Sequence, residues 1–296
     1  MKKNIVCWIL LFSFVFSACS IAYSEEERVY LAIGDSITTG YGLAKDEAGF
    51  PTILAQNNGS TLINRAVNGN TAIGIIEEFD DPSFMAAVGR ADLITITCGG
   101  NDLMNVLYEE IAKAYNRIET GKNDIKGYDI ISILSNPTEA RHSAVLAAAV
   151  AVLNGSKELH IKPFTEGNEI KLALVGYVVN LNIIMTVIRT VNPDADVIIT
   201  TQYNPYESFT GAYAEMNTAM DAGAGALSAV IQNNSSIGGY IVADVYSAFK
   251  ENPDNLMNAS ENPLNLDFHP NAAGHKAIAE CIQMVLDELE QKTERR

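Results

Sequence analysis

Val29-Tyr30-Leu31-Ala32-Ile33-Gly34-Asp35-Ser36 is the segment that decides the fold. Its first five residues are apolar, and most are β-branched or aromatic, which predicts a buried β-strand, while Gly34-Asp35-Ser36 predicts the tight turn that ends it. In a parallel sheet this turn holds the Ser36 hydroxyl at the carboxyl end of its strand, where α/β enzymes hold their catalytic groups. The segment therefore predicts an α/β fold with Ser36 as a candidate nucleophile.

Four further apolar, β-rich runs follow and are separated by segments with helical spacing. They cover residues 61–67, 92–98, 196–203 and 240–246. Strands that alternate with helices predict a parallel sheet covered on both faces and connected by right-handed crossovers. We therefore expect a flavodoxin-like, three-layer α/β/α sandwich with a five-stranded parallel sheet, formed by a single domain over residues 28–292.

The interval between the third and fourth predicted strands is too long for one crossover helix. Residues from about 103 to 191 contain helical patterns, including 142–153 and 169–190. This helical insertion leaves the sheet beside Asn101 and Asp102, at the edge where loops commonly carry specificity. Two interpretations stay open: the insertion is a cap that shapes the substrate site, or its helices extend the hydrophobic core.

His269 is the candidate general base. A serine hydroxyl is a weak nucleophile until a base takes its proton, and histidine titrates near neutral pH. His269 lies in the polar turn Asn265-Leu266-Asp267-Phe268-His269-Pro270-Asn271, ahead of a helical pattern over 272–289. A nearby Asp can fix the tautomer of such an imidazole and stabilise its protonated form. The other three histidines are interpreted as surface or packing residues: His142, His160 and His275.

Four short motifs carry a family resemblance: Gly34-Asp35-Ser36, Asn68-Gly69-Asn70, Gly99-Gly100-Asn101-Asp102 and Asp267-Phe268-His269-Pro270. Each alone is an ordinary turn or helix-cap sequence. Together, and in this order, they resemble the GDSL-type lipases and acylhydrolases of the SGNH hydrolase superfamily, over roughly residues 30–279. The chain has no Gly-x-Ser-x-Gly motif, which argues against an ordinary α/β-hydrolase.

The resemblance implies the same fold and a serine ester hydrolase. It assigns Ser36 as the nucleophile and His269 as the base, and it assigns the oxyanion hole to the Ser36 N–H, the Gly69 N–H and the Asn101 side-chain amide. Donors of this kind stabilise the charge that develops on the ester oxygen, and each commonly lowers the barrier by about 3 kcal/mol. Asp102 is interpreted as structural.

The acid of the predicted triad departs from the family pattern. The family places it three residues before the histidine, where this chain has Leu266, and the nearby carboxylate is Asp267, two residues before. In an extended segment, side chains at i and i+2 point the same way, so Asp267 is the candidate acid. If Asp267 instead points to solvent, a backbone carbonyl orients His269 and the site is a Ser-His dyad.

The substrate class has two candidates at this stage. An enzyme acting on lysophospholipids, other lipids or short acyl esters is favoured by the apolar insertion, and a carbohydrate O-deacetylase acting on extracellular or cell-wall glycan is favoured by predicted export. A less favoured alternative is a non-catalytic extracellular binding module, supported by the shifted acid. We expect no cofactor and no metal. Gln202, Tyr203 and Asn204 follow the fourth predicted strand, and two roles stay open for them: contact with either half of an ester, or hydrogen bonds that satisfy the turn.

The N-terminus predicts export. Lys2-Lys3 precedes an apolar run over 5–15 and a zone of small residues, which is typical of a signal peptide over residues 1–24. An alternative cut within Phe16-Ser17-Ala18-Cys19 resembles a bacterial lipobox and leaves a lipid on Cys19. We therefore expect a secreted protein or a cell-surface lipoprotein whose only membrane contact is that anchor. The net charge of −16 disfavours nucleic acid as a partner, and the sequence leaves the oligomeric state open.

Overall fold

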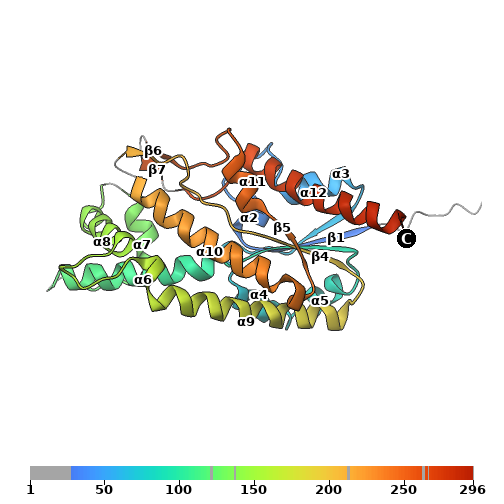
Figure 1. The fold of residues 1–296 in the computed structure, drawn as a ribbon, viewed down its shortest axis with the longest axis horizontal. Coiled ribbons are helices and arrows are strands. Elements are labelled where there is room, and N and C mark those ends of the chain that lie inside the picture. The colour runs from blue at the N-terminus through green and yellow to red at the C-terminus, as the bar shows by residue number, and fades with distance from the viewer. Residues whose placement is uncertain are drawn as a thin grey trace, which may run out of the picture.

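The computed structural model describes residues 28–295, apart from 121–122, 137, 212–213, 262–263 and 266. The predicted signal peptide, the alternative cut at Cys19 and Leu266 lie outside the described residues. Five parallel strands form one sheet in the order β2-β1-β3-β4-β5 (Figure 1). This is the strand order of flavodoxin-like folds, in which the order reverses between β1 and β3. The prediction of a five-stranded, flavodoxin-like sandwich is confirmed.

The strands are short and, at the centre of the sheet, almost wholly buried. They are β1 (Val29–Gly34), β2 (Thr61–Asn64), β3 (Leu93–Thr97), β4 (Asp196–Thr200) and β5 (Ile241–Ala243). β1 pairs with β3 from Tyr30 opposite Leu93 to Gly34 opposite Thr97. The second, fourth and fifth strands end three residues earlier than predicted, because 65–67 and 201–203 leave the sheet as loops at its carboxyl edge and a helix begins at Val245.

Successive residues of β1 face two separate cores. Leu31 and Ile33 belong to one core, and Tyr30 and Ala32 belong to the other, as the two-residue period of a strand requires. The first core includes residues of α4 (Ala72–Glu78), α5 (Pro82–Val88), α9 (Asn168–Val191) and α10 (Ala214–Gly238). The second includes residues of α3 (Phe50–Asn57), α11 (Val245–Glu251) and α12 (Ala272–Glu294).

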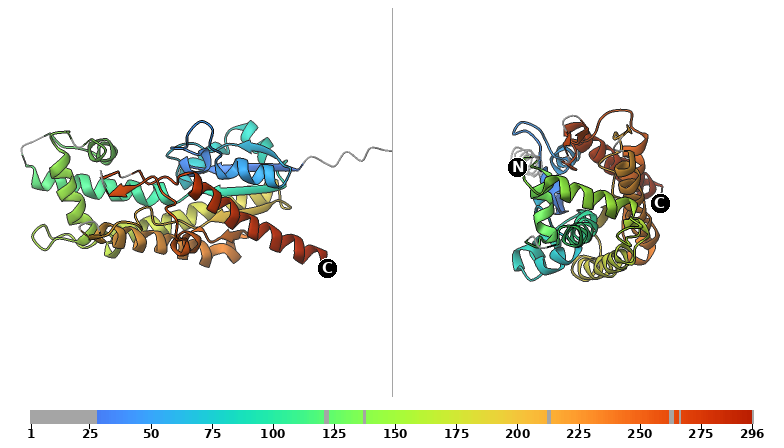
Figure 2. Two further views of the ribbon diagram at one scale, coloured as in Figure 1. Left: turned by 90° about the horizontal axis from the view of Figure 1, so that it is seen from above. Right: turned by 90° about the vertical axis from the view of Figure 1, so that its left-hand side faces the viewer.

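The chain between β3 and β4 is helical throughout most of its length. It forms α6 (Gly100–Ile118), α7 (Gly127–Leu134), α8 (His142–Asn154), a 3₁₀ turn η1 (Phe164–Glu166) and α9. Figures 1 and 2 show α6, α7 and α8 together at the end of the molecule away from the C-terminus. The face of α8 that carries Val145, Ala148 and Val152 is buried in the same core as Leu31 and Ile33, so α8 extends the core.

Two smaller features complete the fold. A two-stranded antiparallel ribbon, β6 (Ser260–Glu261) with β7 (Leu264–Asn265), precedes the segment that contains His269.

Among the described residues, α9 is the one helix long and apolar enough to cross a membrane by length and composition. Its Tyr177, Leu181 and Ile184 are buried in the first core, while its Leu172, Val175 and Val179 are exposed.

Candidate active site

The turn between β1 and the short helix α2 (Ser36–Thr39) positions Ser36. The Asp35 carboxylate caps α2 by accepting the Ile37 N–H at 3.0 Å, and it also accepts the Thr97 hydroxyl at 2.9 Å. A β-carbon at Gly34 would collide with Thr97, so only glycine allows β1 and β3 to approach this closely. Burial raises the pKa of Asp35 to about 6. Ser36 is thereby fixed at the end of β1.

Ser36, His269 and Asp267 form one line of hydrogen-bonded atoms. His269 Nε2 lies 2.9 Å from Ser36 Oγ, and His269 Nδ1 lies 2.6 Å from Asp267 Oδ1. The His269 backbone N–H also donates to Asp267 Oδ1 at 3.1 Å. This second bond folds the aspartate side chain back over its own backbone, which brings a carboxylate two residues before the histidine within reach of the ring. The structure places Asp267 against His269, although its side chain is 30% exposed.

Aromatic rings enclose the imidazole. The ring of Tyr41 lies 4.6 Å from that of His269 between centroids, and the ring of Phe268 lies at 4.5 Å. The Tyr203 hydroxyl donates to the Phe268 carbonyl at 3.0 Å, and the Asn258 N–H donates to the His269 carbonyl at 3.0 Å. These contacts restrain both the ring and the backbone of His269. Sequence reasoning missed Tyr41, because it lies outside the four motifs and no sequence pattern links it to His269.

The residues assigned to an oxyanion hole lie around Ser36. Gly69 lies in a turn closed by the Asn70 N–H donating to the Val67 carbonyl at 3.1 Å, and its φ of +77° is one that glycine adopts readily. Asn101, at the start of α6, donates from its side-chain amide to the Asn70 carbonyl at 2.9 Å. Gly69 and Asn101 line one cavity together with Ser36 and His269.

Asp102 ties this turn to α6. Its carboxylate accepts the Ala72 N–H, the first of α4, at 3.1 Å, and partial burial raises its pKa. The Asn68 side chain accepts the Thr39 hydroxyl at 2.6 Å, which connects the same turn to α2. Asp102 thus acts on the position of the Gly69 turn and touches neither Ser36 nor His269 through any hydrogen bond found, in line with its structural interpretation.

Two cavities meet at Ser36. An open one of about 970 Å³ has Tyr41, Asn68, Asp267 and His269 in its wall, together with Ile131 and Leu134 of α7. A narrower and more enclosed one runs between α6 and α10. Ser36, Asn101 and Phe268 line both cavities. The insertion therefore does both things considered from the sequence: α8 extends the core, while α6 and α7 line the site.

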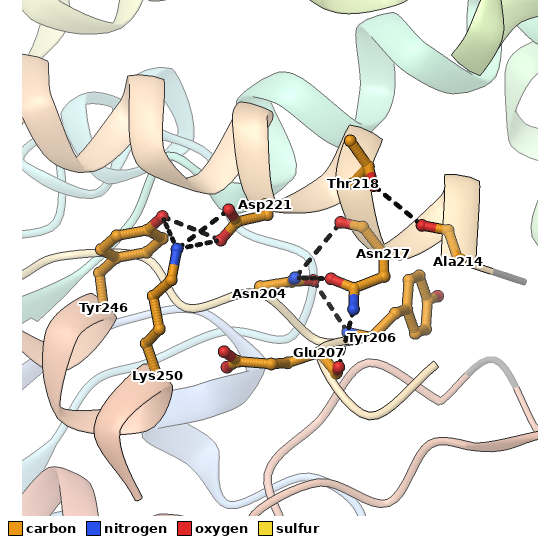
Figure 3. A network of polar contacts seen from close by, with 9 residues as sticks. All are labelled: Asn204, Tyr206, Glu207, Ala214, Asn217, Thr218, Asp221, Tyr246 and Lys250. Carbon is orange, nitrogen blue, oxygen red and sulfur yellow. Dashed lines mark hydrogen bonds and ion pairs between the residues drawn. The ribbon is translucent and has the colours of Figure 1, made fainter. Parts of the chain in front are cut away.

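Two of the three polar residues that follow β4 reach the site. Gln202 and Tyr203 line the enclosed cavity. Asn204 points the other way: its side-chain amide donates to the Asn217 side-chain oxygen at 2.7 Å, as Figure 3 shows. Asn204 thus has the second of the two roles considered from the sequence: it supports the loop after β4 and anchors it to α10.

Comparison with known proteins identifies the family of this chain. Residues 32–277 match the model of the GDSL-like Lipase/Acylhydrolase family. The chain belongs to this family. It is therefore a hydrolase of the esterase and lipase type, as the four motifs indicated.

Individual relatives are distant. The chain is 21% identical to YpmR of Bacillus subtilis (strain 168) over 270 residues, which cover 89% of this chain and 83% of YpmR. A stretch of 107 residues is 34% identical to the spore germination lipase LipC of Bacillus licheniformis and covers 33% of this chain and 50% of LipC.

Solved structures show the same fold. Phospholipase A1 from Streptomyces albidoflavus NA297 superposes with a TM-score of 0.55 at 19% identity, covering 87% of this chain and 99% of that one. An extracellular lipase from Streptomyces rimosus gives a TM-score of 0.55 at 18% identity, with the same coverage of both chains.

Proposed function

We propose that the protein hydrolyses carboxylic esters through an acyl-serine intermediate on Ser36. The observation that carries the proposal is the unbroken line of hydrogen-bonded atoms from Asp267 Oδ1 through His269 to Ser36 Oγ. A serine, a base and an acid in this order form the constellation that activates a hydroxyl for attack on a carbonyl.

In the first half of the reaction, His269 Nε2 takes the Ser36 proton as Oγ attacks the ester carbonyl carbon. The negative charge on the carbonyl oxygen is stabilised by the Ser36 N–H, the Gly69 N–H and the Asn101 amide. An amide nitrogen carries two N–H groups, so the bond to Asn70 leaves one for the oxyanion. The tetrahedral intermediate then collapses, and the alcohol leaves with the proton that His269 returns.

In the second half, water attacks the acyl-serine. His269 takes a proton from the water, a second tetrahedral oxyanion forms in the same hole, and its collapse releases the carboxylic acid and returns the proton to Ser36. Throughout both halves, Asp267 holds the imidazole tautomer and stabilises the protonated ring.

We propose lipid or other acyl esters as the substrate class. The enclosed cavity beside Ser36 supports this over glycan O-deacetylation, because its lining is mainly apolar and extends along α6 and α10 beyond what an acetyl group would contact. The intact line of hydrogen bonds likewise weighs against a non-catalytic binding module, for which a broken triad is expected. Export, through a signal peptide or a lipid on Cys19, remains a proposal from the sequence.

Hydrolysis of p-nitrophenyl acetate by the purified protein tests the proposal. We expect Ser36→Ala to lose at least about a thousandfold in kcat/KM, because the nucleophile is gone. Ser236→Ala, an exposed serine near the end of α10, is the matched control and should retain full activity. Mass spectrometry after reaction with a fluorophosphonate should find the adduct on the peptide that contains Ser36. Equal rates in wild type and Ser36→Ala would contradict the proposal.

A further inference from the structure

The two cavities that meet at Ser36 differ in character. The walls of the enclosed cavity are mainly aliphatic and thioether side chains of α6 and α10, namely Leu103, Met104, Leu107, Met220, Ala224 and Leu227. The open cavity carries hydroxyl, amide and carboxylate groups, from Tyr41, Asn68, Ser135 and Asp267. The ester carbonyl carbon that Ser36 attacks carries the acyl chain on one side and the alcohol group on the other. Each cavity can therefore bind one half of the ester.

A third cavity continues beyond the enclosed one. It is small and is lined by residues of α6, α7, α8 and α10, including Leu134, Ala149 and Leu153. Met104, Leu107 and Met220 line both this cavity and the enclosed one, and so stand between them. Methionine side chains are flexible and adapt to irregular apolar ligands. They are therefore suited to contact the terminal methyl group of an alkyl chain at this boundary.

We propose that the enclosed cavity takes an unbranched fatty acyl chain, that Met104 and Met220 set its length limit, and that the open cavity takes an uncharged polar alcohol. This inference rests on the proposed ester hydrolysis and assigns the substrate class as esters of fatty acids with neutral alcohols such as glycerol.

The electrostatics of the site support a neutral alcohol. Among the described residues that line the open or the enclosed cavity there is no lysine or arginine, and the open cavity contains the Asp267 carboxylate. The whole chain carries a net charge of −16. A phosphate group on the alcohol would find no cationic partner there and would be repelled by the surrounding field. Tyr41, Asn68 and Ser135 instead offer hydrogen bonds suited to hydroxyl groups.

The wall formed by α10 is held in place from outside the cavity. Asn217 binds the loop after β4 through the Asn204 amide at 2.7 Å and the Glu207 carbonyl at 2.8 Å. One turn further along, Asp221 accepts the Tyr246 hydroxyl at 2.8 Å and pairs with Lys250 at 3.1 Å (Figure 3). These contacts fix α10 while Ala219, Met220 and Gly223 line the cavity. The acyl site is therefore largely preformed.

Gly223 allows a direct test of the acyl site. It lies inside α10 and lines the cavity, and no heavy atom lies within 4 Å of where its β-carbon would be. Gly223→Leu should place an isobutyl group in the cavity while raising helix propensity, so folding is preserved. Gly176→Leu is the matched control, because Gly176 is an exposed helical glycine on α9 with equally open space.

The readout is kcat/KM on p-nitrophenyl acetate and p-nitrophenyl decanoate. We expect the decanoate-to-acetate ratio to fall about tenfold or more in Gly223→Leu and to stay at the wild-type value in Gly176→Leu, because methylene groups lost from an apolar pocket each cost a large factor. An unchanged ratio in Gly223→Leu overturns the inference and leaves Ser36-dependent hydrolysis of acetate intact. If no Ser36-dependent turnover of acetate exists, the proposed function fails and the inference fails with it.

Met220→Ala tests the length limit in the opposite direction. Removing this side chain should connect the enclosed cavity with the third cavity. A longer acyl chain would then bury more of its surface in the protein. We expect kcat/KM on p-nitrophenyl palmitate relative to decanoate to rise about tenfold, since each newly buried methylene contributes about fourfold. A ratio that stays constant or falls shows that Met220 does not limit the chain and overturns this part of the assignment.

The alcohol is tested with two esters that share one acyl chain. Against 1-decanoylglycerol, we expect 1-decanoylglycerol 3-phosphate to be hydrolysed with kcat/KM at least about tenfold lower at low ionic strength, with the gap narrowing as salt screens the field. Equal or faster hydrolysis of the phosphate ester overturns the assignment of a neutral alcohol.

Discussion

The catalytic edge of the sheet and the enclosed cavity beside it are built in different ways. At the catalytic edge, bonds between near neighbours in sequence fix the groups: Asp35 caps Ile37, and Asp267 binds both the ring and the N–H of His269. The cavity wall instead pairs α6 with α10, two helices more than ninety residues apart in the chain. Local bonds thus orient the individual catalytic groups, which the long-range contact between Ser36 and His269 then joins, whereas the acyl site depends on helix packing alone.

This difference has a kinetic consequence. Changes at the catalytic edge should lower the rates on all esters by one common factor, because the reacting atoms are the same for each. Changes in the cavity wall should alter the preference among acyl chains. The variants below break or sharpen this separation.

Asp267→Asn should have the largest effect. The amide cannot stabilise the protonated ring, and it favours the wrong imidazole tautomer, so we expect kcat/KM to fall about a thousandfold or more on both acetate and decanoate esters. Asp254→Asn, an exposed carboxylate in the preceding loop, is the control and should keep wild-type rates. A loss below about tenfold would indicate that His269 works without Asp267, as a Ser-His dyad.

Asn101→Ala should rank second. Loss of one oxyanion donor commonly costs about 3 kcal/mol, so kcat should fall about a hundredfold for every acyl chain tested. Asn105→Ala, exposed one turn further along α6, should leave kcat unchanged. Asn101 lines both the open and the enclosed cavity, so its variant also tests whether catalytic rate and acyl-chain preference are separate properties. A large change in the decanoate-to-acetate ratio would show that chemistry and acyl selection share this residue.

His275 belongs to neither region and should affect stability alone. It is fully buried on α12, its Nδ1 accepts the Phe50 N–H at 3.3 Å, and burial, with a smaller effect of nearby His269, lowers its pKa to about 4. The unfolded chain binds this proton near pH 6.5, so the free energy of unfolding should fall as pH drops from about 6.5 to 4, by about 3 kcal/mol.

Denaturant unfolding at pH 7 and pH 4.5 measures this effect. His275→Gln removes the titrating group, so its stability should change less between the two pH values than that of the wild type. His142→Gln, at the start of α8, is the control and should keep the wild-type difference. A His275→Gln protein with an unchanged pH dependence would show that other groups cause it.

The sequence predicts the catalytic edge much better than the cavity. β1 and β3 are recognisable because strands buried on both faces are continuously apolar, and each motif group lies within a few residues of its strand end. The same rule set the ends of the second, fourth and fifth strands too late. The apolar residues Val67 and Tyr203 continue the apolar pattern of their strands. Val67 is nevertheless half-exposed in a turn, and Tyr203 is buried in the loop after β4, where its hydroxyl donates to the Phe268 carbonyl.

The remaining features depend on packing that no local pattern encodes. Tyr41 contacts His269 although more than two hundred residues separate them, and Gly223 and Met104 line one cavity only because α10 packs beside α6. An apolar helix such as α8 has the same composition whether it extends the core or covers a site, so its place had to come from the structure.

Asn217→Ala should have the smallest effect and should act on the cavity side alone. Its side chain joins α10 to the loop after β4 through bonds to Asn204, Glu207 and the Phe209 carbonyl, so its loss should lower the free energy of unfolding by about 1–3 kcal/mol. Thr218→Ala, whose hydroxyl bonds only the Ala214 carbonyl within the same helix, should cost less than about 0.5 kcal/mol.

The same variant should also change selectivity. Without these bonds α10 should be more mobile, so binding a long acyl chain must first order the cavity wall. This cost opposes binding of decanoate more than of acetate. We therefore expect the decanoate-to-acetate ratio of kcat/KM to fall by a few-fold. Denaturant melts and the two-ester assay on one preparation measure both quantities. A loss of stability with an unchanged ratio would show that the network in Figure 3 supports the fold without shaping the acyl site.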